Sequence, residues 1–287
     1  MHPRPFKQID VFSSRPGDGN PLAVVLDATD LDPHTMQRIA AWMNLSETTF
    51  LLPPTPEGRA AGADYRVRIF TPGGELPFAG HPTLGSCHAW LEAGGQPQRA
   101  DMVVQECGIG LVRVRREGDR LAFAAPALRR AEASPALVPL VAGAIGLRPQ
   151  QIVATQMLDN GPVWLGLLVD SAETVLRLAP DHARLKDLGQ DVGVVHVGPQ
   201  AGDTSMPGVV VRAFAAPMGT PEDPVTGSLN ASIAQWLIAE GLAPASYLVA
   251  QGECLGRAGR VQIAQDGDGQ VWVGGQAVTC IEGTALL

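Results

Sequence analysis

Apolar and polar positions alternate over many short segments of this chain, which predicts a protein built largely of β-strands. Asp64-Tyr-Arg-Val-Arg-Ile-Phe70 alternates in this way, and Val209-Val-Val-Arg-Ala-Phe214 is a similar strand candidate in the other half of the chain. Val163-Trp-Leu-Gly-Leu-Leu-Val169 is apolar throughout, so it is predicted to be a strand that is covered on both faces.

A second pattern, with apolar residues three and four positions apart, predicts amphipathic helices. Met36, Ile39, Ala40 and Met43 share one face of a helix that starts at Asp32-Pro33. The chain is therefore predicted to mix strands with helices. The segments predicted to be helical are residues 33–44, 86–93, 134–146, 180–188 and 228–240.

Two similar motifs relate the halves of the chain. His81-Pro-Thr-Leu-Gly-Ser86 and Asp223-Pro-Val-Thr-Gly-Ser228 share their proline, glycine and serine. Each motif follows a strand that ends in phenylalanine and precedes a helix that carries a tryptophan. This shared context predicts a duplicated fold.

Both motifs are predicted to lie at helix N-termini, where unpaired backbone N–H groups and the helix dipole favour an anion. Two such termini facing each other would form an anion-binding cleft between domains, with His81 on one side and Asp223 on the other. The substrate-binding candidates on these motifs are Ser86, Gly227 and Ser228. Other interpretations stay open, because Asp223 and Ser228 are common helix caps and a histidine before proline is often a turn residue.

The length of 287 residues exceeds a usual single core, so two domains of roughly 140 residues each are expected. The hydrophobic pattern lapses between Pro126 and Pro135, which is the candidate linker. The predicted domains are residues 1–126 and 127–287, and the last strand is allowed to pack back on the first domain.

Composition narrows the functional classes. A net charge of −8 argues against a nucleic-acid partner, because phosphate binding needs a concentrated basic face. No apolar run of about 18 residues predicts a membrane span, and the N-terminal residues lack the apolar core of a signal peptide. The cysteines lie far apart without a Cys-x-x-Cys motif, as is typical of reduced thiols, and a cytoplasmic protein is expected. They are Cys87, Cys107, Cys254 and Cys280.

Common motifs for nucleophilic catalysis, cofactor binding and metal binding are missing from the sequence. It has no Gly-x-Ser-x-Gly, no phosphate-binding Gly-x-x-x-x-Gly-Lys-Ser/Thr and no dinucleotide-binding Gly-x-Gly-x-x-Gly that opens a helix. His81 and His88 lie seven residues apart with no third ligand nearby. We therefore expect neither a cofactor nor a metal ion.

Taken together, several motifs resemble the PhzF-like family, which comprises the phenazine-biosynthesis isomerases and relatives of unassigned substrate. The motifs occur in the family's order, and the resemblance covers essentially the whole chain. They are Gln8-Ile-Asp-Val-Phe12, Gly19-Asn-Pro21, Leu45-Ser-Glu-Thr-Thr-Phe50, the stretch from Phe70 to Thr83, and Glu222-Asp-Pro-Val-Thr-Gly-Ser228.

The resemblance implies an α+β fold of the diaminopimelate-epimerase-like type. Two pseudo-symmetric domains each wrap a curved, mostly antiparallel sheet around a central helix, and the active site lies between them. Epimerases of that fold carry a cysteine at the start of each central helix. The matching loops here hold Ala79-Gly-His81 and Glu222-Asp-Pro224 instead, so two-thiol racemase chemistry is not expected.

The resemblance also implies roles for single residues. Glu47 matches the family's acid/base that moves a proton between substrate carbons, while Gly80, His81, Asp223 and Ser228 match groups that assist by binding the substrate. Glu47, His81 and Asp223 are thus the catalytic candidates. A glutamate suits such work when partial burial raises its pKa toward neutrality.

The function expected from these residues is a cofactor-independent isomerase that acts on a small carboxylate-bearing substrate. Two alternatives remain: an amino-acid epimerase or racemase, and a non-catalytic protein that binds small anions. The resemblance further implies a homodimer.

Overall fold

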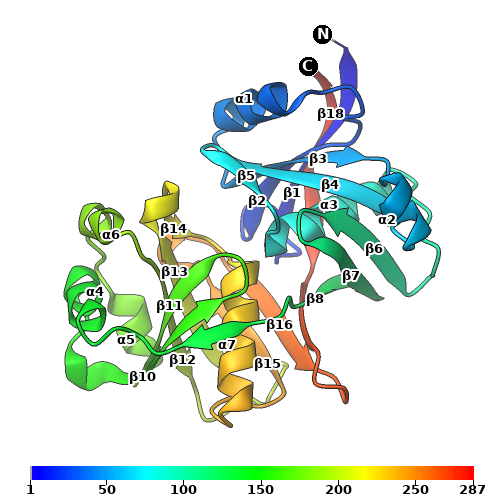
Figure 1. Cartoon of the computed structure of the whole chain (residues 1–287). Coiled ribbons are helices and arrows are strands. Elements are labelled where there is room, and N and C mark those ends of the chain that lie inside the picture. The colour runs from blue at the N-terminus through cyan, green and yellow to red at the C-terminus, as the bar shows by residue number, and fades with distance from the viewer. Residues whose placement is uncertain (1) are drawn as a thin grey trace. The chain divides into compact units, whose positions relative to one another are not determined.

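The computed structural model describes residues 2–287, and the chain divides into two compact units. One unit comprises Met1–Ala124 and Gly274–Leu287, and the other comprises Ala125–Val273. The sequence analysis placed the second domain at residues 127–287 and allowed the last strand to pack back on the first domain, and the last strand does group with the first unit. The reason is backbone pairing: β18 (Ala277–Leu286) runs antiparallel to β1 (Pro3–Val11) along its whole length. Figure 1 shows these two strands side by side.

The first unit wraps a sheet around helix α3 (Gly80–Glu92), whose first eight residues are all buried. Its strands pair in the order β18-β1-β2-β3-β4-β6-β7-β8, with parallel pairs only at β2–β3 and β4–β6 among the described residues of this unit. The remaining elements are β2 (Asn20–Val25), α1 (Pro33–Met43), β3 (Glu47–Leu52), α2 (Pro56–Ala60), β4 (Tyr65–Thr71), β5 (Gly74–Leu76), β6 (Met102–Cys107), β7 (Gly110–Glu117) and β8 (Arg120–Ala124).

The second unit repeats this plan around helix α7 (Gly227–Ala239). Its strands pair in the order β9-β10-β11-β12-β13-β15-β16. Its strands are β9 (Arg129–Ala131), β10 (Ile152–Asp159), β11 (Val163–Val169), β12 (Asp191–Val197), β13 (Val209–Ala215), β14 (Thr220–Asp223), β15 (Ser246–Gln251), β16 (Gly259–Gln265) and β17 (Val271–Gly275), which crosses the unit boundary. Its other helices are α4 (Leu137–Ile145), α5 (Ala172–Arg177), α6 (His182–Leu188) and the short 3-10 turns η1 (Pro149–Gln151), η2 (Ala216–Met218) and η3 (Glu253–Leu255).

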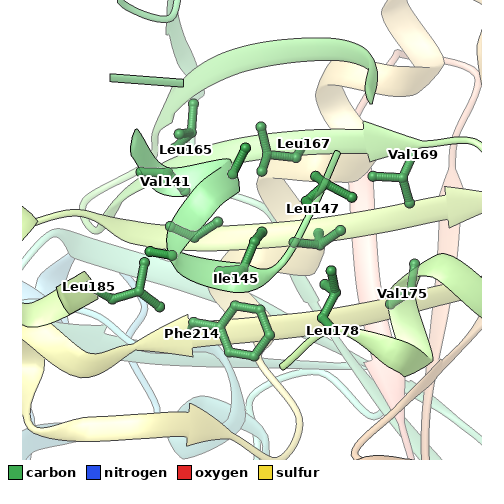
Figure 2. Close-up of a cluster of buried hydrophobic side chains, with 14 of the residues drawn as sticks. Val141, Ile145, Leu147, Leu165, Leu167, Val169, Val175, Leu178, Leu185 and Phe214 are labelled. Atoms are coloured by element: carbon green, nitrogen blue, oxygen red, sulfur yellow. The ribbon is translucent and has the colours of Figure 1, made fainter. Parts of the chain in front are cut away.

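Helices cover both faces of the second sheet. Leu165 and Leu167 point to the face covered by α4, α5 and α6, where they join a buried cluster with Phe214 (Figure 2). On the opposite face, a Cβ atom on Gly193 would lie 2.3 Å from Leu229 of α7, so only glycine allows the helix to pack this closely. The prediction that the apolar strand at residues 163–169 is covered on both faces is confirmed.

The start of the first central helix differs from the prediction. Helix α3 begins at Gly80 instead of residue 86, so His81 and Pro82 lie in its first turn, where proline is tolerated. Helix α7, by contrast, begins only at Gly227, and Asp223 is the last residue of β14. The two similar motifs therefore enter their helices at different positions.

An arginine–glutamate pair braces the hairpin before each central helix. In the first unit, Arg68 Nε and Nη2 donate to the two carboxylate oxygens of Glu75, at 2.7 and 2.6 Å. The guanidinium carbon also lies 5.1 Å from the ring centre of Phe70. The side chains of this pair are 19% and 41% exposed.

The second unit contains the same arrangement in a buried form. Arg212 Nε and Nη2 donate to the carboxylate of Glu222 at 2.9 and 2.8 Å, and the guanidinium carbon lies 4.9 Å from the Phe214 ring centre. Here the side chains of the ion pair are only 6% and 7% exposed. Arg212 Nη1 donates further to the carbonyls of Val175 and Leu178. This pair therefore ties β13 and β14 to the segment around α5.

We expect the Glu222→Gln substitution to lower the free energy of unfolding by about 3 kcal/mol, because it leaves the buried Arg212 charge without its counter-charge. The matched Glu75→Gln substitution affects an ion pair that water already screens, so it should cost about 1 kcal/mol or less. Urea unfolding of both variants measures the difference. Equal losses in the two variants would contradict this interpretation.

Candidate functional site

Glu47 and His81, which lie 34 residues apart in the sequence, come into contact in the first unit. Glu47 is the first residue of β3, and His81 is the second residue of α3. Glu47 Oε2 lies 3.4 Å from His81 Nε2, with side-chain exposures of 14% and 4%. Two residues singled out from separate motifs thus form one polar pair.

His81 is held as a neutral imidazole. Burial lowers its pKa from the usual 6.5 to about 3, because taking the cation out of water is unfavourable. Near neutral pH this ring carries a single proton on one of its two nitrogens. Burial therefore makes His81 a weak proton acceptor at neutral pH, and its catalytic role stays a prediction.

Asn20 determines which nitrogen carries that proton. Its side chain is fully buried, and Asn20 Nδ2 lies 3.3 Å from His81 Nδ1. An amide nitrogen only donates, so His81 Nδ1 accepts and the proton resides on Nε2. His81 Nε2 then carries the proton and lies 3.4 Å from Glu47 Oε2, outside hydrogen-bond geometry, which leaves Glu47 as the proton acceptor of the trio.

Gly80 and Ser86 occupy different environments from each other. Gly80 is the first residue of α3, where backbone N–H groups have no partner within the helix. Ser86 lies in the second turn instead, is fully buried, and donates its hydroxyl to Thr49 Oγ1 at 2.9 Å. The expectation that Ser86 lies at the helix N-terminus is wrong, whereas its part in substrate binding stays a prediction.

In the second unit, a hydrogen-bond network holds the segment between β14, which ends at Asp223, and α7. The N-cap residue of α7 is Thr226, whose hydroxyl donates to Asp223 Oδ2 at 2.6 Å. Gln251 binds the same segment, since its Oε1 accepts from Thr226 N and its Nε2 donates to the carbonyl of Asp223. Asp223 and Ser228 are thus not the N-cap of α7. The sequence analysis missed both Thr226 and Gln251, which carry no local signal of such a role.

Each unit also places an asparagine beside its central helix. Asn20 is the first residue of β2 and contacts His81 on α3, whereas Asn160 follows β10 and donates to the carbonyl of Ser228 on α7 at 2.9 Å. Both asparagines are buried and lie where an antiparallel strand pair is connected, β1–β2 in one case and β10–β11 in the other. The sequence analysis did not identify Asn160, and it noted Asn20 only as part of a family motif.

Across residues 2–287, no group of three or more His, Cys, Asp or Glu side chains lies close enough to hold a metal ion. Within the same residues, no helix is long and apolar enough to cross a membrane.

Comparison with known proteins relates the chain to one family over almost its whole length. The model of the PhzC-PhzF family, described as phenazine biosynthesis-like protein, matches residues 9–283. Trans-2,3-dihydro-3-hydroxyanthranilate isomerase of Pseudomonas aeruginosa is 33% identical over 97% of this chain and 98% of its own length. The Schizosaccharomyces pombe protein named antisense-enhancing sequence 1 is 36% identical over 98% of both chains.

The fold is shared with solved structures. The crystal structure of the Bacillus anthracis PhzF-family protein superimposes with a TM-score of 0.84 over 100% of both chains, at 24% identity. The expected diaminopimelate-epimerase-like fold with two pseudo-symmetric domains is confirmed.

The low pKa of His81 makes stability depend on pH. Below pH 6.5 the unfolded chain binds a proton at this residue that the folded protein does not bind until about pH 3, so stability falls as the pH falls. Between pH 7 and pH 5 we expect the wild type to lose about 2 kcal/mol more than His81→Asn. Urea unfolding at both pH values tests this, and parallel losses in the two proteins would refute the neutral buried imidazole.

The tautomer of His81 can be read from ¹⁵N NMR. The wild type should show the Nε2–H form for His81 and the opposite, Nδ1–H form for His196, whose Nδ1 lies 3.1 Å from the carbonyl of Val169. In Asn20→Asp a carboxylate replaces the donor, so His81 should change to a form protonated on Nδ1 while His196 stays unchanged. An Nδ1–H signal for His81 in the wild type would contradict the assignment.

Proposed function

The chain belongs to the phenazine biosynthesis-like PhzC-PhzF family and is an enzyme of the isomerase class, and from this premise we propose that it moves a proton between two carbons of a small carboxylate-bearing substrate without a cofactor. One observation carries the proposal: Glu47 stands beside a neutral, immobilised imidazole that is no competing proton acceptor.

In the proposed mechanism, Glu47 accepts a proton from one substrate carbon. The electron pair of the broken C–H bond moves into the adjacent double bond of the unsaturated substrate. The resulting carboxylic acid then returns that proton to another carbon on the same face, which regenerates the carboxylate. The neutral His81 ring, whose Nε2 lies 3.4 Å from Glu47 Oε2, keeps an uncharged polar group beside the glutamate in both states. Because His81 itself neither gains nor loses a proton, one residue performs both transfers.

The substrate carboxylate is proposed to bind at helix N-termini. Backbone N–H groups of Gly80 and His81 at the start of α3 are suited to an anion, as are those at Gly227 and Ser228 in α7. Asp223 is proposed to assist from its position at the end of β14. The network around Gln251 supports this, because it immobilises the carboxylate before a substrate arrives.

An epimerase that uses two thiols is less well supported. Cys87 lies inside α3 and is fully buried, and burial raises the pKa of its thiol well above the usual range. The loops before the central helices hold no cysteine. The relative from Pseudomonas aeruginosa is named for trans-2,3-dihydro-3-hydroxyanthranilate, and we propose only the class of small cyclic or unsaturated carboxylates for this chain. A cytoplasmic homodimer stays a prediction.

We expect Glu47→Gln to fold normally and still bind carboxylates, but to lose isomerase activity by about 10²–10⁴-fold. The assay follows deuterium incorporation into carbon positions of candidate substrates in D₂O by NMR. Glu57→Gln, a change on the exposed helix α2, is the matched control and should leave exchange unchanged. Comparable exchange in Glu47→Gln would refute its role, and no exchange in the wild type with any candidate would favour a binding protein.

A further inference from the structure

The connection between β1 and β2 is held by a buried carboxylate that the proposed mechanism does not use. Asp10, close to the end of β1, is only 2% exposed. Its Oδ2 accepts hydrogen bonds from the backbone N–H groups of Gly17 and Gly19, at 2.7 and 2.9 Å. Both glycines belong to the segment that leads into Asn20, the first residue of β2. Asp10 therefore fixes the backbone that brings Asn20 to the central helix.

Asn20 lies at the point where sheet pairing ends. It forms the last pair of the β1–β2 ladder with Val11, and residues 12–19 lie outside that ladder. Phe12 is fully buried and has a φ of 65°, a left-handed conformation that is rare for a bulky side chain. A Cβ atom on Gly19 would lie 2.2 Å from the carbonyl oxygen of Val11, so only glycine fits there. Such a backbone path persists only where other contacts hold it, and the two hydrogen bonds to the carboxylate are contacts of this kind.

The position of Asn20 decides which nitrogen of His81 carries the proton. Asn20 Nδ2 lies 3.3 Å from His81 Nδ1, at the long end of the range for a hydrogen bond. A displacement of Asn20 by about 0.5 Å would break this contact and allow the ring to adopt either tautomer. Gly19 is joined directly to Asn20, so the hydrogen bond at its N–H group controls this position.

The corresponding connection in the second unit is held more weakly. Asp159, the last residue of β10, accepts from the backbone N–H group of Gly161 at 3.1 Å. Its side chain is 31% exposed and forms an ion pair with Arg129. Asn160 at this connection donates to a backbone carbonyl and not to a histidine. The buried carboxylate with two backbone bonds thus occurs in the unit whose asparagine must orient a titratable ring.

We infer that Asp10 is a positioning residue that keeps Asn20 in hydrogen-bond contact with His81. It acts on the reaction through this asparagine, which holds the imidazole in its Nε2–H form beside Glu47. The inference rests on the proposed function, because it adds a further layer of hydrogen bonds to the group that surrounds the proton acceptor. A change at Asp10 should accordingly alter the tautomer of a ring that belongs to a different element.

The inferred role requires an acceptor oxygen at one position and not a negative charge. Both backbone N–H groups donate to Oδ2 of Asp10, while Oδ1 has no hydrogen-bond partner in residues 2–287. An asparagine also offers one acceptor oxygen, so Asp10→Asn should keep the wild-type arrangement. Asp10→Ala removes the acceptor. Asp10→Ser carries a hydroxyl that is one bond shorter and cannot reach both N–H groups.

¹⁵N NMR of the histidine rings tests the inference without any substrate. Asp10→Ala and Asp10→Ser should change His81 from the Nε2–H form to a mixture of both tautomers, whereas Asp10→Asn should keep the Nε2–H form. Asp18→Ala is the matched control, because it removes a carboxylate of the same connection that forms an ion pair with Arg15, and it should leave His81 unchanged. His196 should remain in the Nδ1–H form in every variant.

Three results of this experiment would overturn the inference. The first is a pure Nε2–H form of His81 in both Asp10→Ala and Asp10→Ser. The second is a tautomer mixture in Asp18→Ala as well, since any disturbance of the connection would then be sufficient. The third is loss of folding in both Asp10→Ala and Asp10→Ser, which would assign the carboxylate to stability alone.

A double-mutant cycle tests whether Asp10 acts through Asn20. With a substrate identified in the D₂O assay, Asp10→Ala should lower kcat by about tenfold and change KM by less than about twofold. The double variant Asp10→Ala/Asn20→Ala should be no slower than Asn20→Ala alone, because the second substitution has already removed the contact with the ring. Losses that multiply would show that Asp10 acts independently of Asn20, and would contradict the inference.

The two measurements separate this inference from the proposed function. A tautomer mixture in Asp10→Ala, with no proton exchange by any of the proteins, would support the inferred hydrogen-bond path and refute the isomerase. Proton exchange by the wild type, with the same His81 tautomer in Asp10→Ala and Asp10→Ser, would support the isomerase and overturn the role of Asp10.

Discussion

The chemistry proposed here depends on one buried contact, the neutral His81 ring held between the Asn20 amide and the Glu47 carboxylate. A charged imidazole at this depth would carry a large desolvation cost, and a freely rotating one would present either nitrogen to Glu47. The Asn20 amide prevents this rotation, because its N–H group donates to His81 Nδ1. One asparagine thereby turns a titratable ring into a fixed hydrogen-bond donor.

The duplication has preserved the framework and changed the chemistry. Both units keep a central helix, an arginine–glutamate brace stacked on a phenylalanine, and an asparagine beside the helix. The two units differ in how deeply the arginine–glutamate pair is buried and in where the central helix begins. The second brace is almost wholly buried, and the second helix starts later, so Asp223 lies at the end of β14 and outside the helix. Equivalent positions can therefore take different roles without a change of fold.

Two buried polar side chains of the second unit show how a stable fold can tolerate locally unfavourable residues. Asp191 Oδ1 and the indole N–H of Trp164 have no hydrogen-bond partner in the described chain, and each lowers stability, while the covered faces of the same sheet supply large apolar burial.

Local patterns in the sequence were sufficient to predict several of the strands and helices. The alternation before Phe70, the apolar run at 163–169 and the stripe on α7 reflect side-chain periodicities that short segments carry by themselves. Glu47, His81 and Asp223 were identified as candidates because their motifs resemble a family. The start of α3 at Gly80 was missed, since glycine and proline normally signal a loop and only the buried surroundings of this segment make it helical.

Only the tertiary structure decided which of these residues act together. Glu47 meets His81, and His81 meets Asn20, because β2 and β3 pair beside the first turn of α3, and no local propensity encodes that meeting. Asp191 lies on β12, a strand the pattern did not reveal, and its burial follows from neighbours on β11 and α7. A sequence specifies what each segment prefers, whereas burial, tautomer and unpaired atoms arise from contacts between distant segments.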